Sequence, residues 1–60
     1  MTLKDTYEQA KRNAEQLHRE MYIADGLEDH ALYTQKRLEY EAAMKTRSLA
    51  FRAWIESNEP

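Results

Sequence analysis

Residues that break helices are almost absent from this sequence, and no other feature constrains its fold as strongly. Among sixty residues there is one glycine, Gly26, and one proline, which is the last residue. Valine, which favours strands, does not occur, whereas the eight alanines and the many Leu, Met, Glu, Gln, Lys and Arg residues favour helices. The sequence therefore predicts an all-α protein with at most one interruption.

The first part of the chain carries apolar residues at alternating steps of four and three. An unbroken pattern of this kind places one apolar seam along a helix. Its members are Leu3, Tyr7, Ala10, Ala14, Leu17, Met21 and Ala24. Thr2 and Asp5, three residues apart, predict a capping box at the N-terminus of this helix. Because the middle of the seam is alanine, the helix can lie close to whatever packs on it.

The dipeptide Asp25-Gly26 is the only turn signal inside the chain. A glycine with positive φ commonly follows the end of a helix, so Gly26 predicts such an end. Asp25 and Glu28 together predict a cap for a second helix.

We therefore expect an antiparallel two-helix hairpin that forms a single domain over residues 1–60. Its helices span about 3–24 and about 28–57, with a turn near 25–27. The alternative is one long helix in an extended coiled coil, because a glycine inside a helix costs only about 1 kcal/mol.

Apolar residues of the second predicted helix repeat every eleven residues. Eleven residues make about three helical turns, so the repeat keeps a stripe nearly straight along a helix. One stripe, here called the leucine–alanine stripe, consists of Leu27, Ala31, Leu38, Ala42, Leu49 and Ala53. Another, roughly opposite and here called the aromatic stripe, consists of Tyr33, Tyr40, Met44, Phe51 and Ile55. A helix that is apolar on two sides predicts a neighbour on each side.

We expect the leucine–alanine stripe to pack against the first helix, with Ala14 near Leu38 and Leu3 near Leu49. In this register the apolar segment 49–55 overhangs the first helix, and the aromatic stripe stays uncovered.

A second copy of the chain is the expected cover for these surfaces. Sixty residues bury only about 60% of the surface that their unfolded chain exposes, and the chain has no cysteine to form disulfides. Closed two-fold assembly is the commonest solution among soluble oligomers. We therefore expect a homodimer, or a higher homo-oligomer, built as a four-helix arrangement. This architecture resembles the small dimeric helical-hairpin regulators of the plasmid Rop type, a likeness that implies no function.

The predicted function is that of a small non-enzymatic protein–protein interaction or regulatory module that acts as a homo-oligomer or docks on a larger protein. Aromatic residues, Met and Arg are enriched at the centres of interfaces. The expected interface residues are Tyr33, Tyr40, Met44, Phe51, Arg52, Trp54 and Ile55. The small size and the cysteine-free composition are typical of a cytoplasmic accessory factor of bacteria or phages.

The alternative prediction is a nucleic-acid-associated regulator that uses a weak basic patch on a helical dimer. Basic groups beside aromatic rings bind single strands by stacking and by neutralising phosphates. The candidate contacts are Lys36, Arg37, Lys45 and Arg47. The overall charge opposes this reading: eleven acidic and nine basic residues give a net charge of −2, whereas nucleic-acid-binding domains are typically basic.

No catalytic, cofactor or metal site is predicted. Glu15 and His18 match the Glu-x-x-His motif of di-iron bundles, but the leucine–alanine stripe offers no further glutamate for such a site. The acidic turn around Asp25 lacks the alternating ligands of a calcium loop. No apolar run approaches the roughly 18 residues that a membrane-spanning helix needs, so no membrane association is expected.

Overall fold

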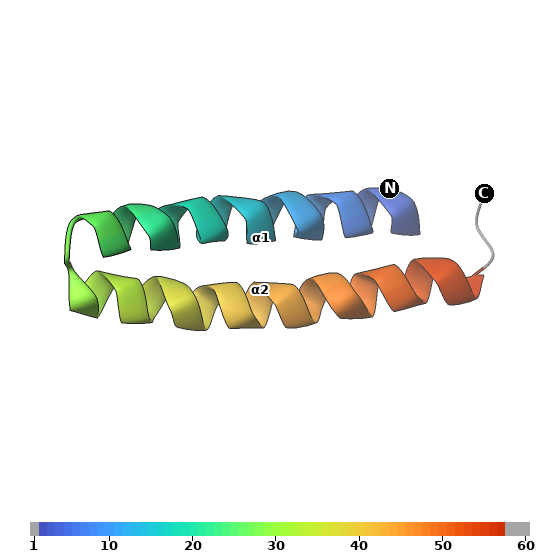
Figure 1. Cartoon of the computed structure of the whole chain (residues 1–60). Helices are drawn as coiled ribbons and strands as arrows, with labels where there is room; N and C mark the ends of the chain where they lie inside the picture. The colour runs from blue at the N-terminus through green and yellow to red at the C-terminus, as the bar shows by residue number, and fades with distance from the viewer. Residues whose placement is uncertain (1, 58–60) are drawn as a thin grey trace.

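The computed structural model describes residues 2–57, which form two α-helices joined by a short turn (Figure 1). Helix α1 spans Leu3–Gly26 and helix α2 spans His30–Ser57. The two helices run antiparallel, side by side, as a rod whose Cα atoms extend over 44 × 13 × 13 Å. The predicted all-α hairpin is confirmed, and the alternative of one continuous helix is wrong.

A capping box begins α1 as the sequence predicts. The backbone N–H of Asp5 donates to Thr2 Oγ1 at 3.0 Å, and the backbone N–H of Thr2 donates to Asp5 Oδ2 at 3.3 Å. The two bonds satisfy backbone donors that the first turn of a helix leaves without partners. Hydrogen bonds from Thr2 also hold the pKa of the Asp5 carboxyl below its ordinary value.

The end of α1 differs from the prediction, because Gly26 is its last helical residue and does not have a positive φ. The left-handed position falls instead on Glu28, with φ of 58°. Backbone N–H groups of Glu28 and Asp29 donate to the carbonyls of Asp25 at 3.0 Å and Ala24 at 3.1 Å, which is a Schellman motif. Ala24 is fully buried, so α1 has to run past it before the chain can turn.

Asp29 caps the N-terminus of α2, a role that the sequence predicts for Asp25. Its carboxylate accepts a hydrogen bond from the backbone N–H of Leu32 at 3.1 Å, and its carbonyl accepts one from Tyr33 at 2.9 Å. The predicted Asp25–Glu28 cap is therefore wrong. Because Asp29 takes part in ending one helix and starting the next, the turn is short and holds the helices antiparallel.

The apolar seam of α1 is confirmed as the surface that packs against α2. All seven of its members are buried or half-buried, and Ala14 and Ala24 are the most completely covered. Alanines at these positions let the two helix backbones approach closely.

The face of α2 that packs against α1 is not the leucine–alanine stripe, so that expectation is wrong. Most residues covered on α2 follow the same three- and four-residue steps as the seam of α1. The residues that follow these steps are Tyr33, Lys36, Tyr40, Ala43, Arg47, Ala50 and Trp54, here called the α2 seam; Leu32 and Met44, beside it, are half-buried as well. Two seams of the same period stay in contact along the whole pair, whereas a stripe that repeats every eleven residues drifts out of contact with a seam that repeats every seven.

The register of the helices also differs from the expected one. The His18 and Tyr40 rings lie 5.3 Å apart, and the Tyr7 and Trp54 rings are stacked at 5.6 Å. Neither the expected pairing of Ala14 with Leu38 nor that of Leu3 with Leu49 is compatible with these contacts. Since Tyr7 also lies 5.2 Å from Phe51, the first helix reaches the segment that was expected to overhang.

Replacing Gly26 with alanine is expected to stabilise the hairpin. The position is helical, has no positive φ, and has no atom within 4 Å of an added Cβ. The free energy of unfolding should rise by about 0.5–1 kcal/mol, the usual helix preference for Ala over Gly. Urea unfolding followed by circular dichroism at one protein concentration measures the change. Glu28→Gly, which relieves the left-handed position, should also stabilise; a loss of stability in Gly26→Ala would place the left-handed residue at Gly26 instead.

Removing the Tyr7 ring is expected to weaken the open end of the hairpin. Tyr7→Ala should lower the free energy of unfolding by about 2 kcal/mol, because the ring packs on both Phe51 and Trp54. It should also shift the fluorescence of Trp54, the only tryptophan, to longer wavelength. Tyr7→Phe, which retains the ring, serves as the control. Unchanged emission in Tyr7→Ala would contradict the stacked geometry.

Candidate functional site

The leucine–alanine stripe runs along the side of α2 that faces away from α1. Five of its six members lie on α2, and Leu27 lies in the turn. Leu38 and Leu49 expose 59% and 60% of their surface, and the three alanines of the stripe are exposed as well. At about 100° per residue, the centre of the stripe lies roughly 150° around α2 from the centre of the α2 seam. The stripe is therefore open to a second molecule.

The aromatic stripe is not left uncovered as a whole, which corrects the expectation for α2. Tyr33, Tyr40 and Met44 are half-buried on the side that faces α1. Phe51 and Ile55, at the edge of this side, remain exposed. The reason is the seven-residue seam of α1, which selects the face of α2 with the matching period.

The remaining residues of the predicted interface lie at the open end of the hairpin. Trp54 is half-buried and stacks on Tyr7, while Arg52 is exposed. A shallow hollow on this end is bordered by Tyr7, Phe51 and Arg52. Of the predicted interface, the residues accessible to a partner are thus Phe51, Arg52 and Ile55, and their role in binding stays a prediction.

Lys36, one of the four predicted nucleic-acid contacts, forms ion pairs with two carboxylates. Its Nζ lies 2.9 Å from Glu20 Oε1 and 3.5 Å from Glu39 Oε2. The hydrogen bond from Lys36 holds the pKa of Glu20 below its ordinary value, and the same bond raises the pKa of Lys36. This pair crosses from α2 to α1, so it helps to fix the register of the helices.

The other three predicted contacts point in different directions around α2. Arg37 Nε lies 3.5 Å from Glu41 Oε1. Arg47 is half-buried in the α2 seam, where its guanidinium donates to Met44 Sδ at 3.8 Å. Lys45 is exposed beside the leucine–alanine stripe. The four basic residues therefore do not combine into one cationic surface on a single hairpin.

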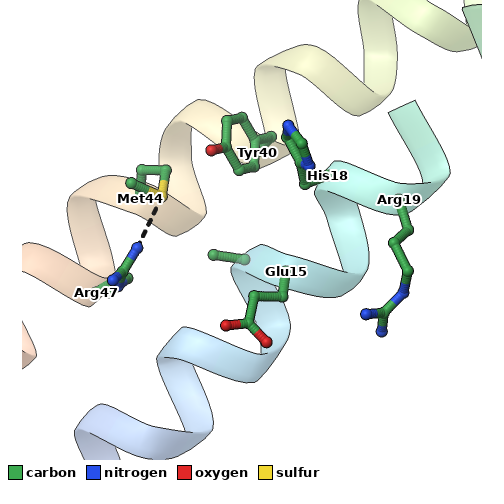
Figure 2. A pocket seen from close by; sticks show the side chains of 7 residues that line it. Glu15, His18, Arg19, Tyr40, Met44 and Arg47 are labelled. Carbon is green, nitrogen blue, oxygen red and sulfur yellow. Dashed lines mark hydrogen bonds between the residues drawn. The ribbon is translucent and has the colours of Figure 1, made fainter. Parts of the chain in front are cut away.

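A shallow depression of about 280 Å³ opens between the helices near their middle (Figure 2). Beside this depression, the His18 ring contacts the rings of Tyr22 and Tyr40. Figure 2 shows Arg47 directed at Met44, and Arg19 extending away from the other labelled side chains. The lining residues are Ala14, Glu15, His18, Arg19, Tyr40, Met44 and Arg47. Three of these residues, Ala14, Tyr40 and Arg47, belong to the seams along which the helices pack, so the depression is a gap in that packing.

Glu15 and His18, the pair that matches the di-iron motif, both border this depression. Among residues 2–57, no three His, Asp or Glu side chains come together in a way that would hold a metal ion. Within the same range, neither helix has the length and apolar character needed to cross a membrane.

Lys36 and Arg47 belong to the packed face of α2, although the apolar pattern of the sequence does not predict them there. Both are charged, and an apolar pattern therefore passes over them. The available signal is their spacing, because they fill the gaps in a run of three- and four-residue steps between Tyr33 and Trp54. Long basic side chains join such seams by packing their aliphatic stems and keeping their charged ends near water.

Comparison with known proteins gives no relative from which a function can be transferred. No protein-family model matches the chain, and no curated protein or solved structure is significantly similar to it. Function therefore has to be inferred from the geometry of the hairpin itself.

The contact between Glu20 and Lys36 is expected to make stability depend on pH. Because the folded state lowers the pKa of Glu20 below 4.5, the contact stabilises the hairpin above that pH. The stabilisation is lost as the pH falls through the lowered value. At the alkaline end, the raised pKa of Lys36 means that stabilisation is complete below 10.5 and is lost above it.

Urea midpoints of the natural chain and of Glu20→Gln, compared from about pH 7 to about pH 2, measure this dependence. The natural chain should be the more stable at neutral pH, and the difference should vanish in acid. Glu8→Gln, which removes only a long 3.9 Å contact with Arg12 on the surface, is the control. A difference between the natural chain and Glu20→Gln that stays constant with pH would contradict the ion pair.

Proposed function

We propose that the chain is a small non-enzymatic protein–protein interaction module that acts as a homo-oligomer. It associates through the leucine–alanine stripe of α2, and its partner surface is another helix. The observation that carries the proposal is the exposure of Leu38 and Leu49 on the side of α2 opposite to α1. Large apolar residues that line one face of a helix are typical of a surface that another molecule covers.

The shape of the hairpin supports a need for a partner. Its Cα radius of gyration is 13.8 Å, whereas a compact domain of sixty residues has about 10.4 Å. The chain exposes 4716 Å², and an unfolded chain of this mass exposes about 10,400 Å². Folding of one hairpin thus buries only about 55% of the chain's surface, which is low even for a small domain.

The composition of the two packed seams also supports a need for a partner. Among residues 2–57, the buried apolar residues are small, namely Ala14, Ala24 and Ala43. The larger residues of the α2 seam are half-buried, and two of them, Lys36 and Arg47, are charged. Two helices alone therefore bury little apolar area, and a second pair of helices is the usual way to enclose a core in a bundle.

The nucleic-acid alternative has weaker support. Lys36 and Arg37 are paired with carboxylates in the hairpin, and Arg47 is half-buried. Such binding would weaken steeply with added salt, because cations are released from the phosphates. Retention on a heparin column that falls with salt is the observation that would favour this alternative.

Replacing Leu38 with lysine is expected to dissociate the oligomer. The change places a charge in the middle of the leucine–alanine stripe, and Leu38 makes no part of the α2 seam, so the hairpin itself should remain helical. The dissociation constant should rise at least tenfold, because a buried charge and the lost leucine both oppose association. Light scattering over a concentration series measures the solution mass, and circular dichroism monitors helix content.

Ile23→Lys is the matched control, since Ile23 is 62% exposed and lies on α1 outside the leucine–alanine stripe. It receives the same substitution at nearly the same exposure and should keep the mass of the natural chain. The proposal is wrong if Leu38→Lys and the natural chain have equal masses at every concentration.

A further inference from the structure

We infer that the leucine–alanine stripe binds a second copy of this same chain, with the two α2 helices antiparallel about a two-fold axis level with position 40. The inference rests on the function proposed above and adds the direction and the register in which the two copies associate. It follows from how leucines and alanines are placed along the stripe.

The stripe is symmetric about position 40 in a particular way. Leu38 and Ala42 lie two residues to either side of this position, and Ala31 and Leu49 lie nine residues to either side. Leu27, in the turn, and Ala53 both lie thirteen residues away. When α2 pairs antiparallel with its own copy about this point, every leucine therefore meets an alanine of the partner at the same level.

Leucine beside alanine is a favourable steric match between helices. Large residues facing small ones interdigitate, which lets the helix axes approach to about 8 Å without leaving voids. Parallel pairing would stack leucine on leucine and alanine on alanine, so that wide and narrow layers alternate. Sliding the antiparallel pair by one eleven-residue repeat would leave one leucine and one alanine without a partner at each end.

This placement favours a second copy over a partner of different sequence. A different protein needs only an apolar stripe to bind, and its binding places no constraint on the order of leucines and alanines here. Self-pairing needs the two residue types to exchange across the centre of the stripe. Reading outward from position 40, one half has Leu38, Ala31 and Leu27, whereas the other has Ala42, Leu49 and Ala53.

Polar residues along the same face are compatible with this pairing. Gln35 and Lys45 lie five residues to either side of position 40. An uncharged amide of one copy therefore lies level with Lys45 of the other, and no two lysines meet.

Glu39 and Glu41 are the carboxylates nearest the axis. In the dimer, each would approach the same residue of the other copy. Glu39 lies 3.5 Å from Lys36, and Glu41 lies 3.5 Å from Arg37. Arg37 offsets the charge of Glu41, and Lys36, which Glu39 shares with Glu20, offsets part of the charge of Glu39. The repulsion between the two copies is reduced accordingly.

The exposed area fits what a small dimer needs. A compact folded protein of 7.2 kDa exposes about 4,100 Å², whereas the hairpin exposes 4716 Å². The excess of about 600 Å² approaches the roughly 800 Å² that each partner contributes to an interface of standard size.

Disulfide trapping tests the register, because the natural chain has no cysteine. Ala31→Cys and Leu49→Cys are prepared separately, mixed, and oxidised in air at mildly alkaline pH. The mixture should give a covalent dimer that contains one copy of each variant. Either variant alone should stay monomeric on a non-reducing gel, since equal positions lie far apart in this arrangement. A mixture of Leu38→Cys and Ala42→Cys should also cross-link. Because position 38 of one copy lies only about 6 Å along the axis from position 38 of the other, the direction of pairing is judged from the Ala31→Cys and Leu49→Cys single variants alone.

The matched control is a mixture of Ala31→Cys with Leu38→Cys, which are not level with each other and should not cross-link. A charge exchange gives a second readout without cysteine. Leu38→Lys alone should be monomeric, and mixing it with Ala42→Glu should restore the dimer mass.

The possible outcomes separate this inference from the proposed function. Covalent dimers from Ala31→Cys or Leu49→Cys alone would show parallel pairing and overturn the inference. A natural dimer that Leu38→Lys dissociates, without cross-links in the 31/49 and 38/42 mixtures, would overturn the register and leave the proposed function intact. A natural chain that is monomeric at every concentration would overturn both.

Discussion

Close contact between two seams of equal period is the interaction on which the rest of this structure depends. On both helices the seam residues advance by three and four, so the contact persists from the turn to the open end. Ala14, Ala24 and Ala43 keep the backbones close, and the Tyr7–Trp54 stack closes the far end. The short turn built around Asp29 brings the two seams into antiparallel contact.

This contact determines what is left for function. Because α1 covers the side of α2 that holds Tyr40 and Trp54, the leucine–alanine stripe is left facing outward. The hairpin therefore covers one apolar side of α2 and leaves the other exposed. Lys36, by contrast, is half-buried and held between Glu20 and Glu39.

Much of the hairpin could be predicted from the sequence, because the features concerned are local. The seam of α1 and the Thr2–Asp5 capping box depend on residues within a few positions of one another. The face of α2 could not be chosen by hydrophobicity, since the leucine–alanine stripe is the more apolar of its two sides. The face of α2 that packs is the one whose residues repeat every seven positions, as the seam of α1 does. Because Lys36 and Arg47 in this repeat are charged, a search for apolar residues does not find it. The turn was misassigned for a related reason: the burial of Ala24 carries α1 through Gly26, and the left-handed position falls on Glu28.

Nuclear Overhauser contacts of the Leu38 and Leu49 methyl groups test the account most directly. They are measured in a sample that mixes labelled and unlabelled chains, so that contacts within and between chains are separated. The account predicts contacts between Leu49 and Ala31, and between Leu38 and Ala42, that appear only between chains, together with a His18–Tyr40 contact within each chain. Contacts of Leu38 or Leu49 with alanines of α1 in the same chain would show that the other face of α2 packs inward, and would contradict it.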